Sequence, residues 1–501
     1  MKFRKITAVL LCILLIMLAG CQSQEGDKSS TASGETNSKD AQENIDVSDM
    51  VTVIYAMPAF ADMSGADKVE AEINKILAEK WGIQMELKYI DFGVWTEQIN
   101  LMLTGSGEVD VLMLFATPLT TFVNNGQLLS LDEYYENSSD AFKAVWPEAT
   151  INATRVGGTL YSITNFRNNA NRYTVNMSAT IVEEMGINPD DITTLEELEA
   201  VLYQVKEAYP DLYPMAPQSQ DLMVNGWSWD GLGDEKYLGV LANRGQDEEV
   251  KSLFETDDFK DFCTKMRDWY TNGLIMADAL SNTESGLTLV QNGKAFAYFN
   301  NSTPAKIDGI VKATILDTWA VANGKANLTY GINANTANAD ESWTLMEALY
   351  TDAEISSLLV NGIEGEHWVY TDENKNLLTY PDGVDLSTAA YSGGFNYWAY
   401  PNARLSIPWA PSDPTFYEEL SIFNTGALQS KASGFAFDST QVANEYTACS
   451  NVMDKYYRAL LCGAIEIDTI EIANAEFEAA GLGTIIAEKQ AQLDAFWALQ
   501  K

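Results

Sequence analysis

Hydrophobic residues between positions 51 and 115 follow two alternating periods, and this pattern restricts the fold more than any other feature of the chain. Segments rich in β-branched residues, or with a period of two, predict strands, whereas apolar residues three and four apart predict helices. The predicted elements are strands at 51–55, 83–89 and 109–115 and helices at 69–81 and 94–103. This order of strands and helices is typical of a parallel sheet covered by helices.

The remainder of the chain has the same mixture with more helix. Thr194 and Glu197 have the spacing of a capping box at the start of one helix, and a second amphipathic helix spans residues 259–270. A short strand is predicted at 295–299, and residues 442–497 are predicted to be helical with a break at two glycines. Because a folded part of about 450 residues exceeds what one hydrophobic core usually supports, we expect an α/β protein of two lobes.

The N-terminal residues have the pattern of an export signal. Cations are followed by an apolar run, and small residues stand directly before Cys21. We interpret residues 1–20 as a lipoprotein signal peptide that is cleaved ahead of a lipid-modified Cys21. A transmembrane helix is one alternative, but the fifteen residues 6–20 would reach only ~22 Å of a hydrocarbon core of ~30 Å. An ordinary signal peptide is the other, and it leaves the cysteine unexplained.

The residues after Cys21 predict a flexible linker. Residues 22–46 contain no aromatic side chain and only Ile45 as a large aliphatic one, so they cannot bury enough apolar surface to offset the entropy of ordering. A random coil of this length spans about 25–30 Å. We therefore expect residues 21–47 to hold the folded part at the extracellular face of a cell membrane through the lipid anchor.

Charge excludes some classes of partner. The chain has 71 acidic residues against 31 Lys and Arg, a formal net charge of -40. A polyanion of this kind does not bind nucleic acid or an anionic membrane surface by general electrostatics. No nucleic-acid partner is therefore expected.

Three cysteines belong to the folded part, namely Cys263, Cys449 and Cys462. A chain of this length and hydrophobic content can build its own cores without disulfides, and the number is odd. We predict three buried thiols, with a Cys449–Cys462 disulfide as the less favoured alternative.

Several motifs together resemble one family. Residues 103–111 (LTGSGEVDV) contain a small-Gly-acid-x-Asp-hydrophobic signature, residues 157–163 (GGTLYSI) a glycine hairpin, and residues 291–297 (QNGKAFA) a helix-to-strand junction. These resemble motifs of the extracellular solute-binding proteins of ABC importers, in the sugar-type group called family 1. Further motifs resemble a lipoprotein subgroup from Gram-positive bacteria that ends in a helical extension; they stand at 362–368, 402–408, 433–438 and 451–457.

The resemblance implies a two-lobe fold of the periplasmic-binding-protein type, type II, with a mixed sheet flanked by helices in each lobe and a helical C-terminal region. We assign residues 48–165 and 286–333 to the N-terminal lobe, and residues 166–285 and 334–501 to the C-terminal lobe. A carbohydrate, expected to be an oligosaccharide, would bind in the cleft between the lobes and pass to the permease subunits of the importer. A monomer without cofactor is expected.

A sugar site needs flat aromatic side chains for C–H faces, and carboxylates, amides or Arg for hydroxyl groups. Several aromatic side chains stand in glycine-containing loops outside helical or strand stripes, and other candidates directly follow predicted strands or crossovers, where ligands of α/β lobes are met. The candidate ligand-binding residues are Phe60, Asp62, Thr117, Arg167, Trp227, Trp229, Asp230, Asn300, Trp368, Tyr397 and Trp398. The alternatives are that the Trp residues cover the core, that those after strands belong to ordinary loops, and that Arg167 and Asn300 stabilise a hinge.

Signals for catalysis are weak. His367 is the single histidine, and no H-E-x-x-H, C-x-x-C or complete phosphate-binding glycine motif is present. A pair of carboxylates in glycosidase geometry is not excluded by sequence. The alternatives to a binding protein are therefore a glycan-active enzyme and a surface polysaccharide adhesin.

Overall fold

The computed structural model describes residues 48–105, 107–217 and 227–499. The predicted signal peptide, the predicted linker and Cys21 lie outside the described residues. Within the described part of the chain, every helix is too short or too polar to cross a membrane.

The first sheet carries the predicted parallel unit. Its strand order is β2-β1-β3-β11-β6, with β1 parallel to β2 and β3, and β11 antiparallel to β3 and β6. The strands are β1 (Thr52–Ala59), β2 (Gln84–Asp91), β3 (Val111–Leu114), β6 (Ile163–Thr164) and β11 (Thr329–Ile332). The prediction for residues 51–115 is confirmed, although the whole sheet is mixed rather than parallel.

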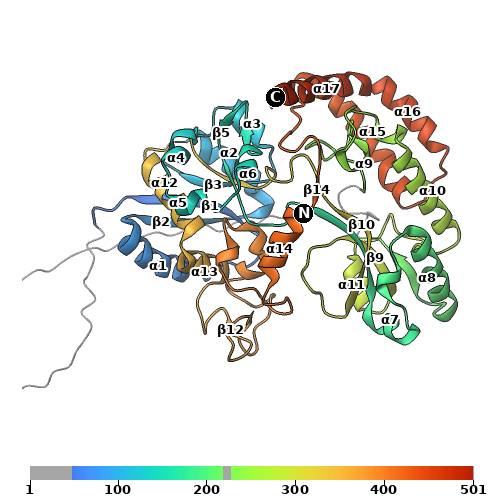
Figure 1. Cartoon of the computed structure of the whole chain (residues 1–501), viewed down its shortest axis with the longest axis horizontal. Helices are drawn as coiled ribbons and strands as arrows, with labels where there is room; N and C mark the ends of the chain where they lie inside the picture. Colours follow the sequence, from blue (N-terminus) through green and yellow to red (C-terminus); the bar gives the residue numbers. More distant parts are fainter. Residues whose placement is uncertain (1–47, 106, 218–226, 500–501) are drawn as a thin grey trace, which may run out of the picture. The chain divides into compact units, whose positions relative to one another are not determined.

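Helices surround this sheet (Figure 1). They are α1 (Ala66–Ile76), α2 (Trp95–Thr104), α3 (Leu119–Asn124), α4 (Asp132–Asn137), α5 (Asp140–Lys143), α6 (Glu148–Asn152), α12 (Ala339–Thr351), α13 (Ala353–Asn361) and α14 (Phe416–Thr425). Short 3-10 and π turns and the two hairpins β4–β5 and β12–β13 complete the unit; they are η1 (Leu77–Trp81), η2 (Phe92–Val94), η5 (Gly393–Ala399), η6 (Ala403–Leu405), β4 (Arg155–Val156), β5 (Thr159–Leu160), β12 (Val369–Tyr370) and β13 (Leu378–Thr379). We call this unit the first lobe.

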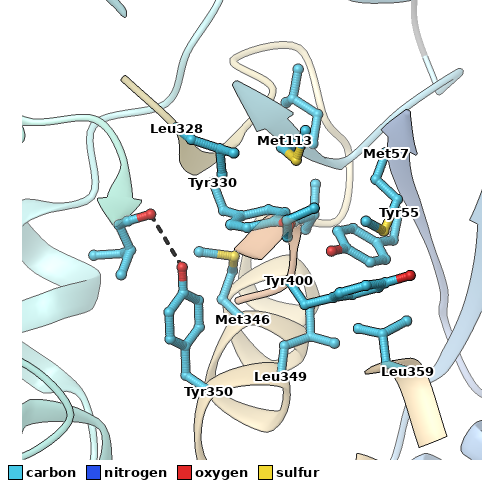
Figure 2. Packing of buried hydrophobic residues seen from close by; sticks show 14 of the residues in the cluster. Tyr55, Met57, Met113, Leu328, Tyr330, Met346, Leu349, Tyr350, Leu359 and Tyr400 are labelled. Carbon is cyan, nitrogen blue, oxygen red and sulfur yellow. Dashed lines mark hydrogen bonds between the residues drawn. The ribbon is translucent and has the colours of Figure 1, made fainter. Parts of the chain in front are cut away.

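Tyrosine and methionine fill much of the first core. Tyr55, Tyr330, Tyr350 and Tyr400 lie together with Met346 beneath the sheet (Figure 2). Burial raises the pKa of the tyrosine hydroxyls, so they remain protonated. Tyr350 donates to the carbonyl oxygen of Ile163 at 3.1 Å, which ties α12 to β6 (Figure 2).

The aspartate of the signature at 103–111 has a structural role. Asp110 is buried, and its carboxylate accepts a hydrogen bond from the backbone N–H of Ile54 at 2.8 Å and another from the Thr336 hydroxyl. It therefore joins the start of β3 to β1 and to the chain that follows β11. These two hydrogen bonds satisfy the buried carboxylate, and they explain why the signature has an acid at this position.

A second sheet forms the core of the second lobe. Its order is β14-β10-β7-β9-β8, with antiparallel pairs in the centre and parallel pairs at both edges. The strands are β7 (Asn171–Ser178), β8 (Tyr213–Ala216), β9 (Ala295–Asn301), β10 (Ile310–Ala320) and β14 (Leu428–Gln429). The helices are α7 (Ala179–Met185), α8 (Leu195–Ala208), α9 (Ala242–Gly245), α10 (Asp257–Thr271), α11 (Gly286–Gln291), α15 (Ala443–Leu461), α16 (Thr469–Ala480) and α17 (Leu482–Leu499), with the 3-10 turns η3 (Pro189–Asp191), η4 (Leu253–Glu255) and η7 (Thr440–Val442).

The structure confirms the helix start and the helix break that the sequence predicted in the second lobe. The capping box of Thr194 and Glu197 begins α8, and both of its hydrogen bonds are present. Gly481 ends α16 in a left-handed conformation (φ 95°), as expected from the predicted break. Helices α15, α16 and α17 pack against one another beside α10 (Figure 1).

Cys263, Cys449 and Cys462 are buried thiols of this core, so the alternative Cys449–Cys462 disulfide is wrong.

The structure divides the chain differently from the assignment we made from the sequence. Residues 286–320 were assigned to the N-terminal lobe, but β9 and β10 pair with β7 in the second sheet. Residues 339–427 were assigned to the C-terminal lobe, but α12, α13 and α14 pack into the first core. The reason is that hydrophobic periods identify an element without identifying the sheet that it covers.

Candidate functional site

An aromatic residue directly follows each of the three parallel strands of the first sheet. Phe60 follows β1, Phe92 follows β2, and Phe115 follows β3. Because parallel strands in register end at the same edge, these rings meet: the Phe60 centroid lies 5.2 Å from Phe92 and 5.9 Å from Phe115. Phe92 is 47% exposed, so this group presents aromatic surface to solvent.

Trp398 adds a fourth ring to this group. Its centroid lies 4.8 Å from that of Phe60 and 6.1 Å from that of Phe115. The turn η5 that carries it is anchored on both sides, since the Asn165 amide donates to the Trp398 carbonyl and the Tyr330 hydroxyl donates to the Ala399 carbonyl. We call Phe60, Phe92, Phe115 and Trp398 the aromatic platform.

Glycine is required in the turn that holds Trp398. A Cβ atom at Gly394 would overlap the ring of Trp409, whose indole N–H donates to the Asn361 side chain at 2.8 Å. The glycines of the sequence motif at 393–394 therefore allow close packing rather than special backbone angles.

Arg167 lies against the platform. Its guanidinium carbon is 5.8 Å from the centre of the Trp398 ring, and Nε donates to the Asn168 carbonyl at 3.3 Å. Burial lowers the pKa of Arg167 to about 10, and the Tyr397 hydroxyl opposes this shift, so the group is charged at neutral pH. Within the described residues no carboxylate forms an ion pair with Arg167, which leaves most of its N–H donors for another partner.

A cavity of about 800 Å³ adjoins the platform and is lined by both lobes. The first lobe contributes Phe92, Phe115, Ala116, Thr117, Pro118, Leu119, Thr120, Asn124, Ala153, Arg155, Val156, Gly157 and Arg167. The second lobe and its connections contribute Gly233, Glu235, Asn323, Ala326, Asn327, Gly434, Phe435, Ala436, Asp438, Tyr446, Gln492, Ala495 and Phe496. A volume of this size suits a drug-sized or larger ligand.

Four charged side chains line the cavity. Arg155 is committed to Asp132, since the two form an ion pair at 2.5 Å. Glu235 and Asp438 stand on the side of the second lobe and Arg167 on that of the first. The remainder of the lining is apolar or consists of neutral donors and acceptors, which is the chemistry needed for a polyhydroxylated ligand.

The structure brings five of the predicted site residues together. Thr117 and Arg167 line the cavity. Phe60 and Trp398 belong to the aromatic platform, and Tyr397 lies beside Arg167 and packs edge-on against Phe416.

Trp229 and Asp230 are buried in the second core rather than exposed in a loop. Trp229 packs edge-on against Phe259 at 5.6 Å. The Asp230 carboxylate accepts hydrogen bonds from the backbone N–H groups of Leu232 and Ala322, at 2.9 and 2.8 Å. Both residues therefore stabilise the second lobe, and neither belongs to the cavity lining.

The other predicted residues lie elsewhere. Trp227 contacts Phe262 and lines a separate cavity of about 690 Å³ in the second lobe. Trp368 is buried, and its indole N–H donates to the Gly362 carbonyl at 3.1 Å. Asp62 is exposed and caps its own turn through Ser64 N–H, and Asn300 lies in β9 with its amide at 3.4 Å from Ser302.

Sequence reasoning missed Phe92 and Phe115. Phe92 comes soon after the predicted strand at 83–89, so the rule used for Phe60 and Thr117 would have found it. Phe115 was assigned to the predicted strand at 109–115 and follows β3 only in the structure. The residues of the second lobe that line the cavity carried no such signal, because they stand in irregular loops and at the end of a helix.

His367 is a structural residue in the first lobe. It is 3% exposed, and its Nδ1 accepts a hydrogen bond from the backbone N–H of Ile363 at 2.9 Å. Burial lowers the pKa of His367, and the nearby Lys68 acts in the same direction while Glu366 opposes it. Within the described residues His367 Nε2 has no hydrogen-bond partner.

We predict that this histidine makes stability depend on pH. Because its folded-state pKa is lowered, the neutral form is favoured in the fold, and its contribution is complete above the ordinary pKa of about 6.5 and is lost as pH falls below that value. Urea unfolding should show a larger loss between pH 7.5 and 5.5 for the wild type than for His367→Gln. Equal losses in the two proteins would contradict this assignment.

The described residues contain no group of three or more His, Cys, Asp or Glu side chains placed to hold a metal ion. The titratable groups of the cavity also stand apart from any histidine, since His367 is buried on the first lobe away from the lining. The arrangement can bind a ligand by stacking and hydrogen bonding.

Two family profiles match the sequence. Residues 72–358 match the family described as bacterial extracellular solute-binding protein. Residues 431–498 match a domain of unknown function. A carbohydrate ABC transporter substrate-binding protein of Streptococcus pneumoniae serotype 4 is 24% identical over 443 residues, which cover 86% of this chain and 88% of that protein.

Solved structures show the same fold. The N-glycan transport solute binding protein NgtS of Streptococcus pneumoniae has a TM-score of 0.78 at 22% identity, with 90% of this chain and 100% of that chain covered. Its complexes with Man1GlcNAc and Man5GlcNAc give TM-scores of 0.69 and 0.65 at 22% identity, covering 89% and 90% of this chain and 99% of those chains. The expected two-lobe α/β fold is thereby confirmed. Since the first profile spans more than half of the sequence, the chain belongs to the family of bacterial extracellular solute-binding proteins.

Proposed function

We propose that this protein captures an oligosaccharide between its two lobes and delivers it to the permease of an ABC importer. Family membership supports the role of a binding protein, and the relative in Streptococcus pneumoniae is described as a carbohydrate transporter component. NgtS, which shares the fold, has been solved with bound glycans. The ligand is bound and released unchanged, without covalent chemistry.

The observation that carries this proposal is the aromatic platform beside a cavity lined by both lobes. Phe60, Phe92, Phe115 and Trp398 offer apolar faces for the C–H surfaces of sugar rings. Arg167 offers N–H donors at the edge of the same surface. A cavity of about 800 Å³ has room for more than one sugar ring.

The direct test is titration calorimetry with a panel of neutral oligosaccharides of increasing length, including Man1GlcNAc and Man5GlcNAc. At least one sugar is expected to bind with a Kd near 1 μM, about -8 kcal/mol, and to change the tryptophan fluorescence. A panel in which no sugar binds more tightly than about 1 mM would exclude the assignment.

We further propose that Cys21 anchors a monomeric protein at the extracellular face of the cell membrane. The support is the order of cations, apolar run, small residues and cysteine at the N-terminus. Mass spectrometry of the mature protein should find a diacylglycerol-modified cysteine as the first residue, and an unmodified N-terminus would exclude the anchor.

A further inference from the structure

Part of the cavity wall belongs to the C-terminal region that matches a domain of unknown function. That region spans residues 431–498. Loop 433–438 and the last turns of α17 line the cavity together with Thr117 and Asn124 of the first lobe. The position of these groups shows that the region contributes to the cavity and is not only an appendage on the outside of the second lobe.

Helix α17 fixes the two loops that form this wall. Lys489 donates to the carboxylate of Asp234 and to the Gly239 carbonyl, both at 2.9 Å, and so holds the loop that contains Gly233 and Glu235. One turn further along, Gln492 exchanges two hydrogen bonds with the backbone of Asp438, at 3.0 and 2.9 Å. Loops held by a helix in this way present their side chains in a fixed position.

Asp438 is one of two acidic residues of this wall, together with Glu235. One carboxylate oxygen accepts hydrogen bonds from the backbone N–H and hydroxyl of Thr440, at 3.0 and 2.5 Å. The other accepts a hydrogen bond from the side-chain amide of Asn124, on α3 of the first lobe, at 2.9 Å. Asn124 and Asp438 both line the cavity, so the second oxygen has a partner that a ligand hydroxyl can replace.

Phe496 supplies an aromatic surface on the same wall. It is partly buried, lies 5.6 Å from Phe435 in an edge-on arrangement, and lines the cavity. A sugar chain that begins on the platform would therefore meet a second aromatic side chain and a carboxylate.

We propose that residues 431–498 are a ligand-binding element, in which Asp438 accepts a hydrogen bond from a sugar hydroxyl in place of Asn124 and Phe496 packs against a sugar ring. This inference rests on the proposed function. It assigns the C-terminal region the role of selecting the length and the hydroxyl pattern of a neutral oligosaccharide.

The experiment compares Asp438→Ala with Asn124→Ala, because each removes the same hydrogen bond but only the first removes the acceptor. Phe496→Ala tests the aromatic contact, and Thr440→Ala removes the cap of Asp438 while keeping its carboxylate. Glu471→Gln, an exposed side chain on α16, is the matched control within the same region. Binding is measured on an immobilised array of neutral glycans that includes Man5GlcNAc, with melting temperature as the check on folding.

Asp438→Ala and Phe496→Ala are each expected to weaken binding by about tenfold or more, and Asn124→Ala by less than about threefold. Equal effects of Asp438→Ala and Asn124→Ala would show a latch between the lobes instead of a ligand contact and would overturn the assignment of Asp438. If wild type binds and all variants bind equally well, this inference fails while the proposed function stands. If wild type binds no glycan on the array, both fail. Should Asp438→Ala not fold, Phe496→Ala alone tests the inference, and unchanged binding in that variant would overturn it.

Discussion

Replacing Trp398 with Ala is expected to weaken oligosaccharide binding by about 1–3 kcal/mol, because it removes a partly exposed indole that a sugar ring would cover. The ring is also in contact with the rest of the site. It packs against both Phe60 and Phe115 and lies beside Arg167, so its loss leaves three neighbours without a common packing partner. Titration calorimetry with the tightest sugar of the panel measures the change.

Trp81→Ala is the matched control for this variant. Trp81 is a partly buried indole at the end of η1 in the same lobe, where its N–H faces Asp352 and not the cavity. The Trp81→Ala variant should be less stable than the wild type but should bind the sugar with the same affinity. An unchanged Kd for Trp398→Ala, with the fold intact, would place the sugar away from the aromatic platform.

Replacing Lys489 with Met is expected to destabilise the second lobe by about 3–5 kcal/mol, the largest effect on stability that we predict. Lys489 and Asp234 are buried, with side chains 0% and 1% exposed, and their charged atoms are 2.9 Å apart. Burial by itself would raise the pKa of Asp234, but Lys489 and the Tyr446 hydroxyl lower it, so the carboxylate is charged. Without Lys489 this charge remains buried and unpaired. Urea unfolding followed by circular dichroism measures the loss.

The double variant Asp234→Asn with Lys489→Met separates the lost charge pair from lost packing. Asp234 accepts backbone hydrogen bonds from Lys236 at Oδ1 and from Leu238 at Oδ2, at 2.8 Å each, and the single amide oxygen of an Asn side chain can still accept one of the two. We expect the double variant to recover a substantial part of the stability lost by Lys489→Met, because no unpaired charge remains. A double variant less stable than Lys489→Met would contradict the view that the unpaired carboxylate causes the loss.

A local rule identified two of the candidate residues that the structure places at the aromatic platform or the cavity. Phe60 and Thr117 were identified because they follow predicted strands, and the structure places Phe60 in the aromatic platform and Thr117 in the lining of the cavity. Trp227 and Trp398 both stand in loops rich in glycine and aromatic residues, yet only Trp398 lies on the platform. Nothing in either loop specifies the surface against which it packs, so sequence could not separate them.

Contacts between distant residues decided the remaining site residues. Asp230 has the appearance of a ligand group in sequence, but its carboxylate is occupied by the backbone N–H of Ala322, which is 92 residues away. Asp438 ends the motif at 433–438 but was not among the candidate ligand residues, and Gln492 on α17 holds its backbone where it lines the cavity. These pairings depend on which distant segments of the second lobe pack together, and a single sequence does not reveal that packing.

The sequence by itself determined the order of strands and helices in residues 51–115, the capping box of α8 and the break between α16 and α17. These features depend on hydrophobic period, side-chain caps and glycine, which act between residues a few positions apart. Only the tertiary structure decided that β9 and β10 belong to the second sheet, that three phenylalanines and Trp398 meet at one edge, and that the C-terminal helices support a wall of the cavity. Those outcomes depend on packing between segments far apart in the chain, and these long-range contacts stabilise the protein only when the whole fold has formed.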